Sequence, residues 1–534
     1  MNTHRSVLKN HHVVVVGAGM GGLSVAVDLA RQGIKITVID KAPSPGGKMR
    51  EVKVGGTFID AGPTVFTMRW VFESLFSDAG SNLTDALSLE KAEVLARHAW
   101  RGENAPPTTL DLYADIEASV NAIGDFASAK DAEGYRLFCA RSKAIYQTLK
   151  DSYIASQRPS PLDLVRRIGF TNLGDLINIA PFRSLWGALG DYFPDPRLRQ
   201  LFARYATYVG SSPALAPATL MLIAHVEQDG VWTVKGGMRR IADAIQTLGQ
   251  RHGAEYKFST NVEEIIVLAN TVTGVRIKRH DGTEDVIACD AVVFNGDVSA
   301  LTLTQDRGGS ILGDNVKRTV LPKPTPALDR SLSAITWNMR APINARQSHS
   351  SPHTSYTPHH HNVFFAPNYL DEFSAVFNSR RIASTPTVYV CAQDRPFATE
   401  NETNAKDERL LVLINAPADG DTHSISTAEI ARLTDATFGL IRDCGYQIDN
   451  PDEDVVLTTP DKFHDLFPGT GGALYGRANH GAMASFARVG AKTAINGLYL
   501  AGGSVHPGPG VPMATLSGRL AAAQLLADLS HTKR

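Results

Sequence analysis

The chain opens its first structural unit with Val13-Val14-Val15-Val16-Gly17-Ala18-Gly19-Met20-Gly21-Gly22. Four consecutive valines predict a strand that is buried on both faces. The glycines that follow have the Gly-x-Gly-x-x-Gly spacing of a turn between a strand and a helix. Gly17 permits the tight turn, Gly19 lets the backbone approach a pyrophosphate, and Gly22 lets the helix pack against the strand. The segment predicts a Rossmann-like unit that binds a dinucleotide.

The residues after the turn complete this unit. Leu23, Val27 and Ala30 recur at helical spacing, and 34–39 is predicted to form a second strand that stops at Asp40. The helix N-terminus offers free N–H groups and a positive dipole end to phosphates. Asp40 follows the turn by about 20 residues, where a carboxylate accepts hydrogen bonds from ribose hydroxyls. The competing interpretation is an α/β turn that binds no nucleotide.

Length and composition limit the class of protein. The chain has 534 residues, 43% of them hydrophobic and 20% charged, which indicates a folded protein of two domains. Its net charge of −1 gives no basic field, so we expect no nucleic-acid partner. Four scattered cysteines argue against a disulfide framework or a zinc site and favour a reducing cytoplasm. Residues 1–12 are polar and lack the apolar core of a signal peptide, and no segment is predicted to span a membrane.

A second glycine pair, Gly46-Gly47-Lys48, follows shortly after Asp40, and Asp60-Ala61-Gly62-Pro63-Thr64 comes next. A glycine pair with a cation at this place is not expected of an NAD dehydrogenase. It resembles the Gly-Gly-Arg element of flavin-dependent amine oxidases and carotenoid desaturases, with Lys48 at the arginine position. The resemblance implies that Gly46, Gly47 and Lys48 meet the pyrophosphate and the flavin end of FAD.

The C-terminal region repeats the strand, turn and helix pattern. A strand at 497–501 runs into the glycine-rich turn 502–510, and a helix is expected to start near Pro512. The positive end of that helix suits the negative charge that a reduced flavin carries near N1 and O2. The residues that we expect at the cofactor here are Gly502, Gly503, Val511, Pro512 and Met513.

These blocks together resemble the bacterial-type phytoene desaturase family, a branch of the flavin amine oxidase superfamily. The resemblance covers nearly the whole chain and includes Gly236-Gly237-Met238. It implies bound FAD, and a main-chain contact from Val262 to the adenine. The chain departs from the family where Pro509 replaces a small residue and where Lys48 replaces the arginine, and either change bears on the flavin geometry.

Two further segments, 60–69 and 204–213, look most like the hydroxyneurosporene (methoxyneurosporene) desaturases. That branch places a 3,4 double bond in 1-hydroxylated acyclic carotenoids of the 1-hydroxyneurosporene type, in spheroidene- and spirilloxanthin-type biosynthesis of photosynthetic bacteria. The alternatives within the family are a phytoene desaturase and a carotene isomerase. Outside it they are a flavin amine oxidase and a non-enzymatic prenyl-lipid carrier like the GDP-dissociation inhibitors.

The expected architecture is α/β, a two-domain flavoprotein of the amine-oxidase and GDP-dissociation-inhibitor type. A Rossmann-like FAD domain is expected from residues 1–75, 235–300 and 465–534. A discontinuous substrate domain of mixed sheet and helices is expected from 76–234, where helical periodicity dominates, and 301–464.

The expected partners follow from a long apolar substrate. The segment 162–193 mixes an apolar face with Trp and Arg, which is typical both of a membrane-surface helix and of a helix packed on its own domain. Because a carotenoid resides in lipid, we expect peripheral contact with the inner or photosynthetic membrane from the cytoplasmic side. Oxygen or a quinone is expected to accept electrons from the reduced flavin.

Two side-chain questions stay open in the sequence. The histidines at 349, 353, 359, 360 and 361 favour a flexible loop over a metal site, because no cysteine or ordered carboxylate lies near them in sequence. No catalytic residue is assigned, since Arg69, His225, Glu227 and His506 are as well explained by structural roles as by proton transfer.

Overall fold

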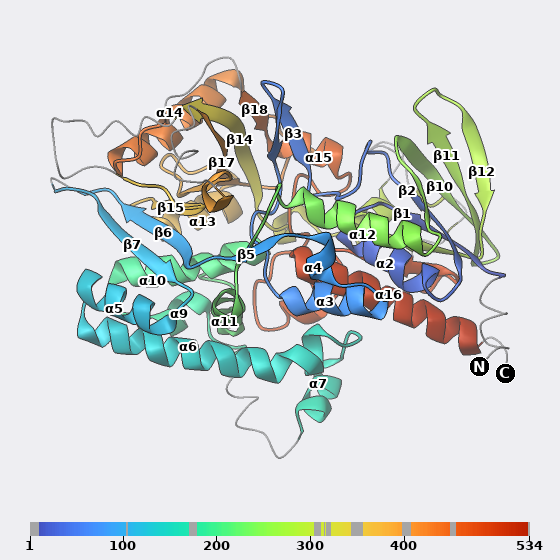
Figure 1. Cartoon of the computed structure of the whole chain (residues 1–534), viewed down its shortest axis with the longest axis horizontal. Helices are drawn as coiled ribbons and strands as arrows, with labels where there is room; N and C mark the ends of the chain where they lie inside the picture. The colour runs from blue at the N-terminus through green and yellow to red at the C-terminus, as the bar shows by residue number, and fades with distance from the viewer. Residues whose placement is uncertain are drawn as a thin grey trace.

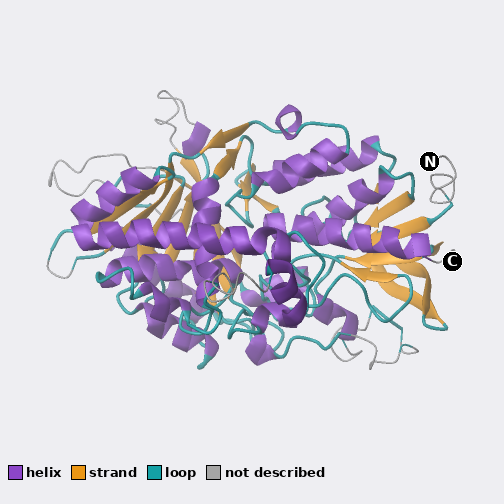
Figure 2. Ribbon diagram, turned by 90° about the horizontal axis from the view of Figure 1, so that it is seen from below, coloured by secondary structure: helices purple, strands orange, loops and turns teal. Residues whose placement is uncertain are grey.

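The computed structural model describes residues 10–102, 105–169, 179–303, 311–313, 316, 322–342, 356–397, 407–448 and 455–531. Figure 1 shows one sheet system at each end of the molecule, with helices along one side and between them. Seen from below, the strands gather toward both ends (Figure 2). None of the helices among the described residues is long and apolar enough to cross a membrane.

The first sheet is parallel and has five strands in the order β19-β13-β1-β2-β9. Val13 to Val16 are buried in the central strand, as four consecutive valines require. Helices α2, α12 and α16 pack together beside this sheet. The bounds are β1 His12–Val16, β2 Lys35–Ile39, β9 Glu255–Lys257, β13 Ala291–Phe294, β19 Leu498–Leu500, α2 Met20–Ala30, α12 Arg239–Arg251 and α16 Val511–His531.

An antiparallel sheet of β10, β11 and β12 adjoins the parallel one. Residues 280–283, whose sequence His-Asp-Gly-Thr predicts a hairpin turn, join β11 to β12. The sequence of residues 256–265 predicts a single strand, which is wrong, because the chain divides there into β9 and β10, which belong to different sheets. Ser259, with φ of +50°, turns the backbone between them. The bounds are β10 Thr260–Leu268, β11 Thr271–Arg279 and β12 Glu284–Ala288.

The second large sheet has seven strands in the order β18-β14-β17-β16-β15-β6-β7. It is mixed, because β15 and β6 run parallel while the other neighbours are antiparallel. The strands β6 and β7 correct the largely helical expectation for 76–234. The bounds are β6 Val94–Trp100, β7 Thr108–Tyr113, β14 Ser333–Pro342, β15 His361–Phe365, β16 Val388–Ala392, β17 Asp407–Ala416 and β18 Val455–Thr458.

Helices α5, α6, α7, α9, α10 and α11 lie below this sheet in Figure 1, and α14 lies at its upper side. The 21-residue helix α6 begins after Ser128, whose hydroxyl accepts a hydrogen bond from the Asp131 N–H. Helix α10 starts at Pro196, as the proline predicts. The bounds are α5 Ile116–Phe126, α6 Ala129–Leu149, α7 Pro161–Ile168, α9 Leu185–Leu189, α10 Pro196–Ala203, α11 Leu222–Asp229, α13 Tyr369–Phe377, α14 Thr427–Asp443 and α15 Pro460–Leu466.

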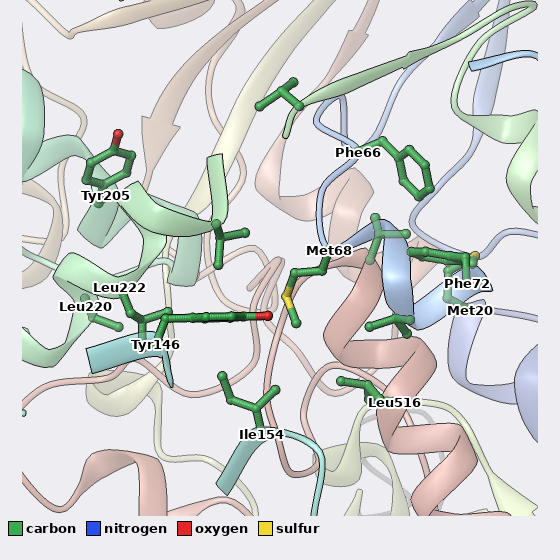
Figure 3. Packing of buried hydrophobic residues seen from close by; sticks show 14 of the residues in the cluster. Met20, Phe66, Met68, Phe72, Tyr146, Ile154, Tyr205, Leu220, Leu222 and Leu516 are labelled. Carbon is green, nitrogen blue, oxygen red and sulfur yellow. The ribbon is translucent and has the colours of Figure 1, made fainter. Parts of the chain in front are cut away.

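One hydrophobic cluster joins the helices of the Rossmann-like part to those of the other part. Figure 3 shows Met68 between Tyr146 on one side and Met20 and Leu516 on the other. The hairpin of β3 and β4 also bridges the two parts, since it contacts β14 and β17. The five domain boundaries stay a prediction. The remaining bounds are β3 Glu51–Val54, β4 Thr57–Asp60, β5 Leu89–Lys91, β8 Trp232–Val234, α3 Arg69–Asp78 and α4 Leu83–Ala86.

Candidate active site

A cavity of about 1340 Å³ runs from the glycine turn of β1 to the seven-stranded sheet. A single small-molecule pocket commonly measures about 300–1,000 Å³, so this cavity has room for a cofactor and a second molecule. Of the thirteen residues that the sequence assigns to the cofactor, all but Gly22 line it. They are Gly17, Gly19, Asp40, Gly46, Gly47, Lys48, Val262, Gly502, Gly503, Val511, Pro512 and Met513.

The two N-terminal glycine pairs form one cradle. Gly46 donates its N–H to the carbonyl oxygen of Ala18 at 2.9 Å, and Gly19 and Gly46 form a β-bridge. A Cβ on Gly19 would lie 2.8 Å from Nδ2 of Asn295, and one on Gly47 would lie 3.1 Å from Cα of Gly19. Because side chains here would fill the cradle, the backbone itself forms the wall, at the N-terminus of α2.

Gly22 faces the strand instead of the cavity. A Cβ on this residue would lie 2.0 Å from the carbonyl oxygen of Gly17 and 3.1 Å from the Val15 side chain. This is the close helix–strand packing that the third glycine of the motif provides. Gly22 therefore positions the cradle without contacting its contents.

Asp40 and Val262 lie where the cavity passes the ends of β2 and β10. The Asp40 carboxylate accepts hydrogen bonds from the N–H groups of Ala18 at 2.6 Å and Ala42 at 2.8 Å. Burial raises the pKa of Asp40, and these two N–H groups oppose that shift. Each carboxylate oxygen has a second lone pair, so a ribose hydroxyl still fits there.

Lys48 is buried, and its Nζ donates to the backbone carbonyl of Leu474 at 2.6 Å. Burial lowers the pKa of this ammonium group to about 8. The ammonium also lies 5.4 Å from the ring centroid of Phe467. A cation with a depressed pKa at a cavity wall suits an anionic group such as a pyrophosphate, which would restore its charge.

The C-terminal glycine block meets the N-terminal one. A Cβ on Gly21 would lie 2.9 Å from the N atom of Gly502, and Gly502 donates to Oγ of Ser517 at 3.0 Å. Helix α16 starts at Val511, so its first N–H groups and its positive dipole end face the same cavity as those of α2. Two helix N-termini, glycine walls and a buried cation fit FAD.

Three polar residues that support this cradle were missed in the sequence. Asn295 lines the cavity and donates from Nδ2 to the Gly17 carbonyl at 3.3 Å. Arg488 is buried and holds the loop at 475–479 to Gly503 through their carbonyl oxygens. Asp60 accepts from the Met238 N–H at 2.6 Å at the start of α12. The polar end of a buried strand was the one available signal for Asn295.

The substrate end of the cavity combines apolar walls with buried polar side chains. Its walls carry Leu220, Ile223, Val363, Leu411 and Leu413 among others. The polar groups come from separate elements, since Arg204 and Tyr208 lie on the 3₁₀ helix Arg204–Val209, Tyr369 on α13, and Thr336, Tyr389 and Asn415 on the seven-stranded sheet. No sequence motif predicted this set.

The family model for flavin containing amine oxidoreductases matches residues 20–526. The chain belongs to this family. It is 47% identical over 527 residues to "Hydroxyneurosporene desaturase" of Rubrivivax gelatinosus, covering 99% of this chain and 95% of that one. It is 28% identical to "1-hydroxycarotenoid 3,4-desaturase" of a Flavobacterium species, covering 95% of this chain and 98% of that one.

The fold agrees with this assignment. A solved structure of putrescine oxidase with bound putrescine has a TM-score of 0.59 to this chain at 14% identity, covering 97% of this chain and 99% of that one. At this identity the likeness concerns the fold alone. The chain is thus an FAD-dependent oxidoreductase with a Rossmann-like part and a discontinuous part of mixed sheet and helices.

None of the four polar residues considered for proton transfer lines the cavity. Arg69 pairs with Glu73 at 2.8 Å, and His225 lies against the Tyr146 ring. The ring of His506 makes hydrogen bonds to backbone carbonyls at 153 and 156. Glu227 accepts hydrogen bonds from the hydroxyls of Tyr205, at 2.8 Å, and Tyr208. Their contacts are structural.

Of the clustered histidines, His349 and His353 lie outside the described residues. His361 is the first residue of β15, and His360 directly precedes it. His361 pairs with Cys391 of β16, so a cysteine lies near both histidines in the fold, although none is near them in sequence. The possible metal-binding atoms of His360, His361 and Cys391 all lie within 4.8 Å of one another. Burial lowers the pKa of His360 to about 4 and raises that of the Cys391 thiol. These three side chains lie on strands or directly beside them, so the flexible loop expected for the histidines is wrong at His360 and His361.

Proposed function

We propose that this flavoenzyme introduces the 3,4 double bond into 1-hydroxylated acyclic carotenoids of the 1-hydroxyneurosporene type. The observation that carries the proposal is the 47% identity over nearly full length to a protein named for hydroxyneurosporene desaturation. The cavity supports it, because one volume connects the glycine cradle to a largely apolar chamber on the seven-stranded sheet. An extended polyene needs such a chamber, whereas a small polar amine does not.

In this proposal FAD is held by the backbone of the two glycine blocks, by the N-termini of α2 and α16, by Asp40 at the ribose, by Lys48 and by Val262 at the adenine. Bound FAD supplies the hydride acceptor that side chains cannot provide. The chain itself binds the polyene, holds the reacting carbons at a fixed place and excludes water. The hydrogen that leaves as a proton is not assigned to a side chain.

We further propose that the enzyme takes its substrate from a membrane through the region of α7. Leu162 and Phe182 are 71% and 89% exposed, while Leu164, Ile179 and Pro181 nearby line the cavity. Residues 170–178, the centre of the amphipathic segment, lie outside the described residues. Exposed apolar side chains beside a cavity wall are suited to insertion among lipids.

Vesicle co-sedimentation tests the membrane contact. Leu162→Asp combined with Phe182→Asp is expected to lower the bound fraction by at least about tenfold, because each large apolar side chain contributes about 1.5–3 kcal/mol when buried. Leu268→Asp is the matched control, since Leu268 is 59% exposed on the distant antiparallel sheet. Equal binding of both variants would contradict the proposed surface.

The electron acceptor is proposed to be a quinone or oxygen. Reduced enzyme mixed anaerobically with a short-chain quinone separates the two, because only quinone use gives flavin reoxidation without oxygen. Absorbance of the oxidised flavin is the readout.

The proposed reaction is tested by pigment analysis of a bacterial host that makes neurosporene, with and without a carotenoid 1-hydroxylase. Expression of this chain is expected to give a longer-wavelength product only when the hydroxylase is present. Desaturation of phytoene or of unhydroxylated neurosporene would instead assign an early desaturase. A product of unchanged mass would assign an isomerase, and protein that binds no FAD would favour a lipid carrier.

A further inference from the structure

The substrate end of the cavity contains polar groups that are buried and have no protein partner. Among the described residues, none forms a hydrogen bond with Nε of Arg204 or with the Tyr369 hydroxyl. Both residues line the cavity, from the 3₁₀ helix at 204–209 and from α13. Buried polar atoms are almost always hydrogen-bonded, so two of them at one cavity wall indicate a ligand with a polar group.

The two groups act in the same neighbourhood. The charge of Arg204 lies close enough to Tyr369, and to His361 on β15 and His98 on β6, to act on their pKa values. No carboxylate of the described residues lies within 4.0 Å of the Arg204 guanidinium, whose one hydrogen bond, from Nη1, runs to the Tyr208 hydroxyl at 3.1 Å. Against the effect of burial, the Glu227 carboxylate, which accepts from the Tyr208 hydroxyl, compensates this charge and helps to raise the pKa of Arg204, but the Nε–H still has no acceptor among the described residues and can donate to a ligand.

The seven-stranded sheet forms the cavity wall beside Arg204 and Tyr369. Thr336, Leu413, Tyr389 and Val363 pair in one row across β14, β17, β16 and β15, and all four line the cavity. The Tyr389 hydroxyl is already engaged by Thr64 and His361, both at 2.7 Å. The free hydrogen-bonding capacity at this end therefore lies with Arg204, Tyr369 and the Thr336 hydroxyl on the sheet, beside an apolar surface.

We propose that Arg204 and Tyr369 bind the hydroxyl group of the carotenoid and select hydroxylated over unhydroxylated chains. This inference rests on the proposed function. The carotenoid hydroxyl oxygen accepts a hydrogen bond from Nε–H of Arg204. The carotenoid hydroxyl also donates to the Tyr369 oxygen or accepts from the Tyr369 hydroxyl. A hydrocarbon end would leave both groups unpaired in an apolar site.

The same contact sets which carbons react. A polyene presents the same apolar surface along its length, so apolar walls hold it without fixing how far it has slid in. The hydroxyl carbon is only a few bonds from the 3,4 position, so one polar anchor fixes the reacting carbons in the cavity. Arg204 and Tyr369 are thus specificity and positioning residues, and they take no part in the transfer of hydrogen.

The test uses full-length, FAD-loaded enzyme with vesicles that contain 1-hydroxyneurosporene or neurosporene, and it compares kcat/KM for each. Tyr369→Phe is expected to lower the preference for the hydroxylated substrate about tenfold. Arg204→Met, which removes the charge as well, is expected to lower it about a hundredfold. Activity on neurosporene is expected to rise in Arg204→Met, because the hydrocarbon end then no longer meets a buried charge.

Two comparisons separate specificity from structure. Arg199→Met is the matched control on α10, since Arg199 does not line the cavity and bonds to the Trp186 carbonyl, and its preference should equal that of the wild type. Tyr369→Phe removes a hydroxyl that has no protein partner, so the melting temperature of this variant should not fall. It therefore tests the role of the polar pair in substrate preference even if Arg204→Met does not fold.

The outcomes distinguish the two proposals. Wild-type enzyme that converts neither carotenoid would contradict the proposed function itself. Wild-type enzyme that prefers the hydroxylated chain, with an unchanged preference in Tyr369→Phe, would overturn the role of the polar pair in specificity and leave the proposed function in place.

Discussion

The two ends of the cavity are built by different means. At the flavin end, short consecutive segments present backbone, and glycines at 19, 21, 47 and 502 are needed because a Cβ would meet neighbouring atoms. At the substrate end, single side chains from five or more elements converge on an apolar chamber. Backbone sites of this kind demand a fixed residue type at fixed spacing, whereas side-chain sites demand only that distant elements meet. The flavin end should therefore tolerate substitution less.

The largest effect is expected at Gly22. In Gly22→Ala the new methyl would lie 2.0 Å from the Gly17 carbonyl, so α2 must move away from β1. We expect a loss of about 3 kcal/mol in the free energy of unfolding and purified protein without flavin. Urea unfolding and the flavin-to-protein absorbance ratio measure these.

Gly124→Ala is the matched control, since its Cβ would lie 3.7 Å from the Cβ of Ala132, an ordinary contact, within helix α5. This variant is expected to be as stable as the wild type or up to about 1 kcal/mol more stable. Full flavin content in Gly22→Ala would contradict the distinction between the two ends. It would mean that the backbone cradle tolerates a side chain at the contact that positions it.

The second-largest effect on the free energy of unfolding is expected for substitution of Glu227, near the substrate end. Glu227→Ala leaves the buried hydroxyls of Tyr205 and Tyr208 without their acceptor. We expect the free energy of unfolding to fall by about 2–3 kcal/mol, with flavin content retained. Glu227→Gln keeps an acceptor oxygen and is expected to lose less. Loss of flavin together with stability would show that the two ends do not behave separately.

Lys48 gives the flavin end a pH dependence. Burial lowers its pKa to about 8, and an anionic pyrophosphate favours the protonated form. FAD binding then takes up a proton above pH 8, so the dissociation constant for FAD should rise with pH, by up to about tenfold per unit, until the pKa of the complex is passed. Flavin fluorescence titrations between pH 7 and 9.5 measure this.

Arginine keeps its charge over that range, so Lys48→Arg should bind FAD with little pH dependence. Lys48→Met should bind FAD more weakly at pH 7, and its dissociation constant for FAD should not change with pH. An equal slope in Lys48→Arg and wild type would place the titrating group elsewhere.

The sequence predicts one end much better than the other for a physical reason. The unit from β1 to β2 and the start of α16 follow from contiguous glycine, valine and proline patterns, and twelve of the thirteen expected cofactor residues line the cavity. Arg204 and Tyr369 are separated by more than 160 residues, and nothing local marks either as a cavity residue. The break at Ser259 was missed because its φ of +50° is imposed by the surrounding fold.

The smallest effect is expected where the two ends meet. The Tyr389 hydroxyl lies 2.7 Å from the Thr64 hydroxyl, which joins the loop after the flavin-side segment at 60–63 to strand β16. Thr64→Val should cost about 1 kcal/mol in the free energy of unfolding, and Tyr389→Phe about 1–2 kcal/mol, because it also removes the hydrogen bond to His361. Because both remove the same hydrogen bond, the double variant should lose less than the sum by about 0.5–1 kcal/mol. Strict additivity would mean that this hydrogen bond does not couple the flavin loop to the substrate sheet, and would leave the hydrogen bonds of Asn338 and Gln393 to the Asp60 backbone as polar links between them.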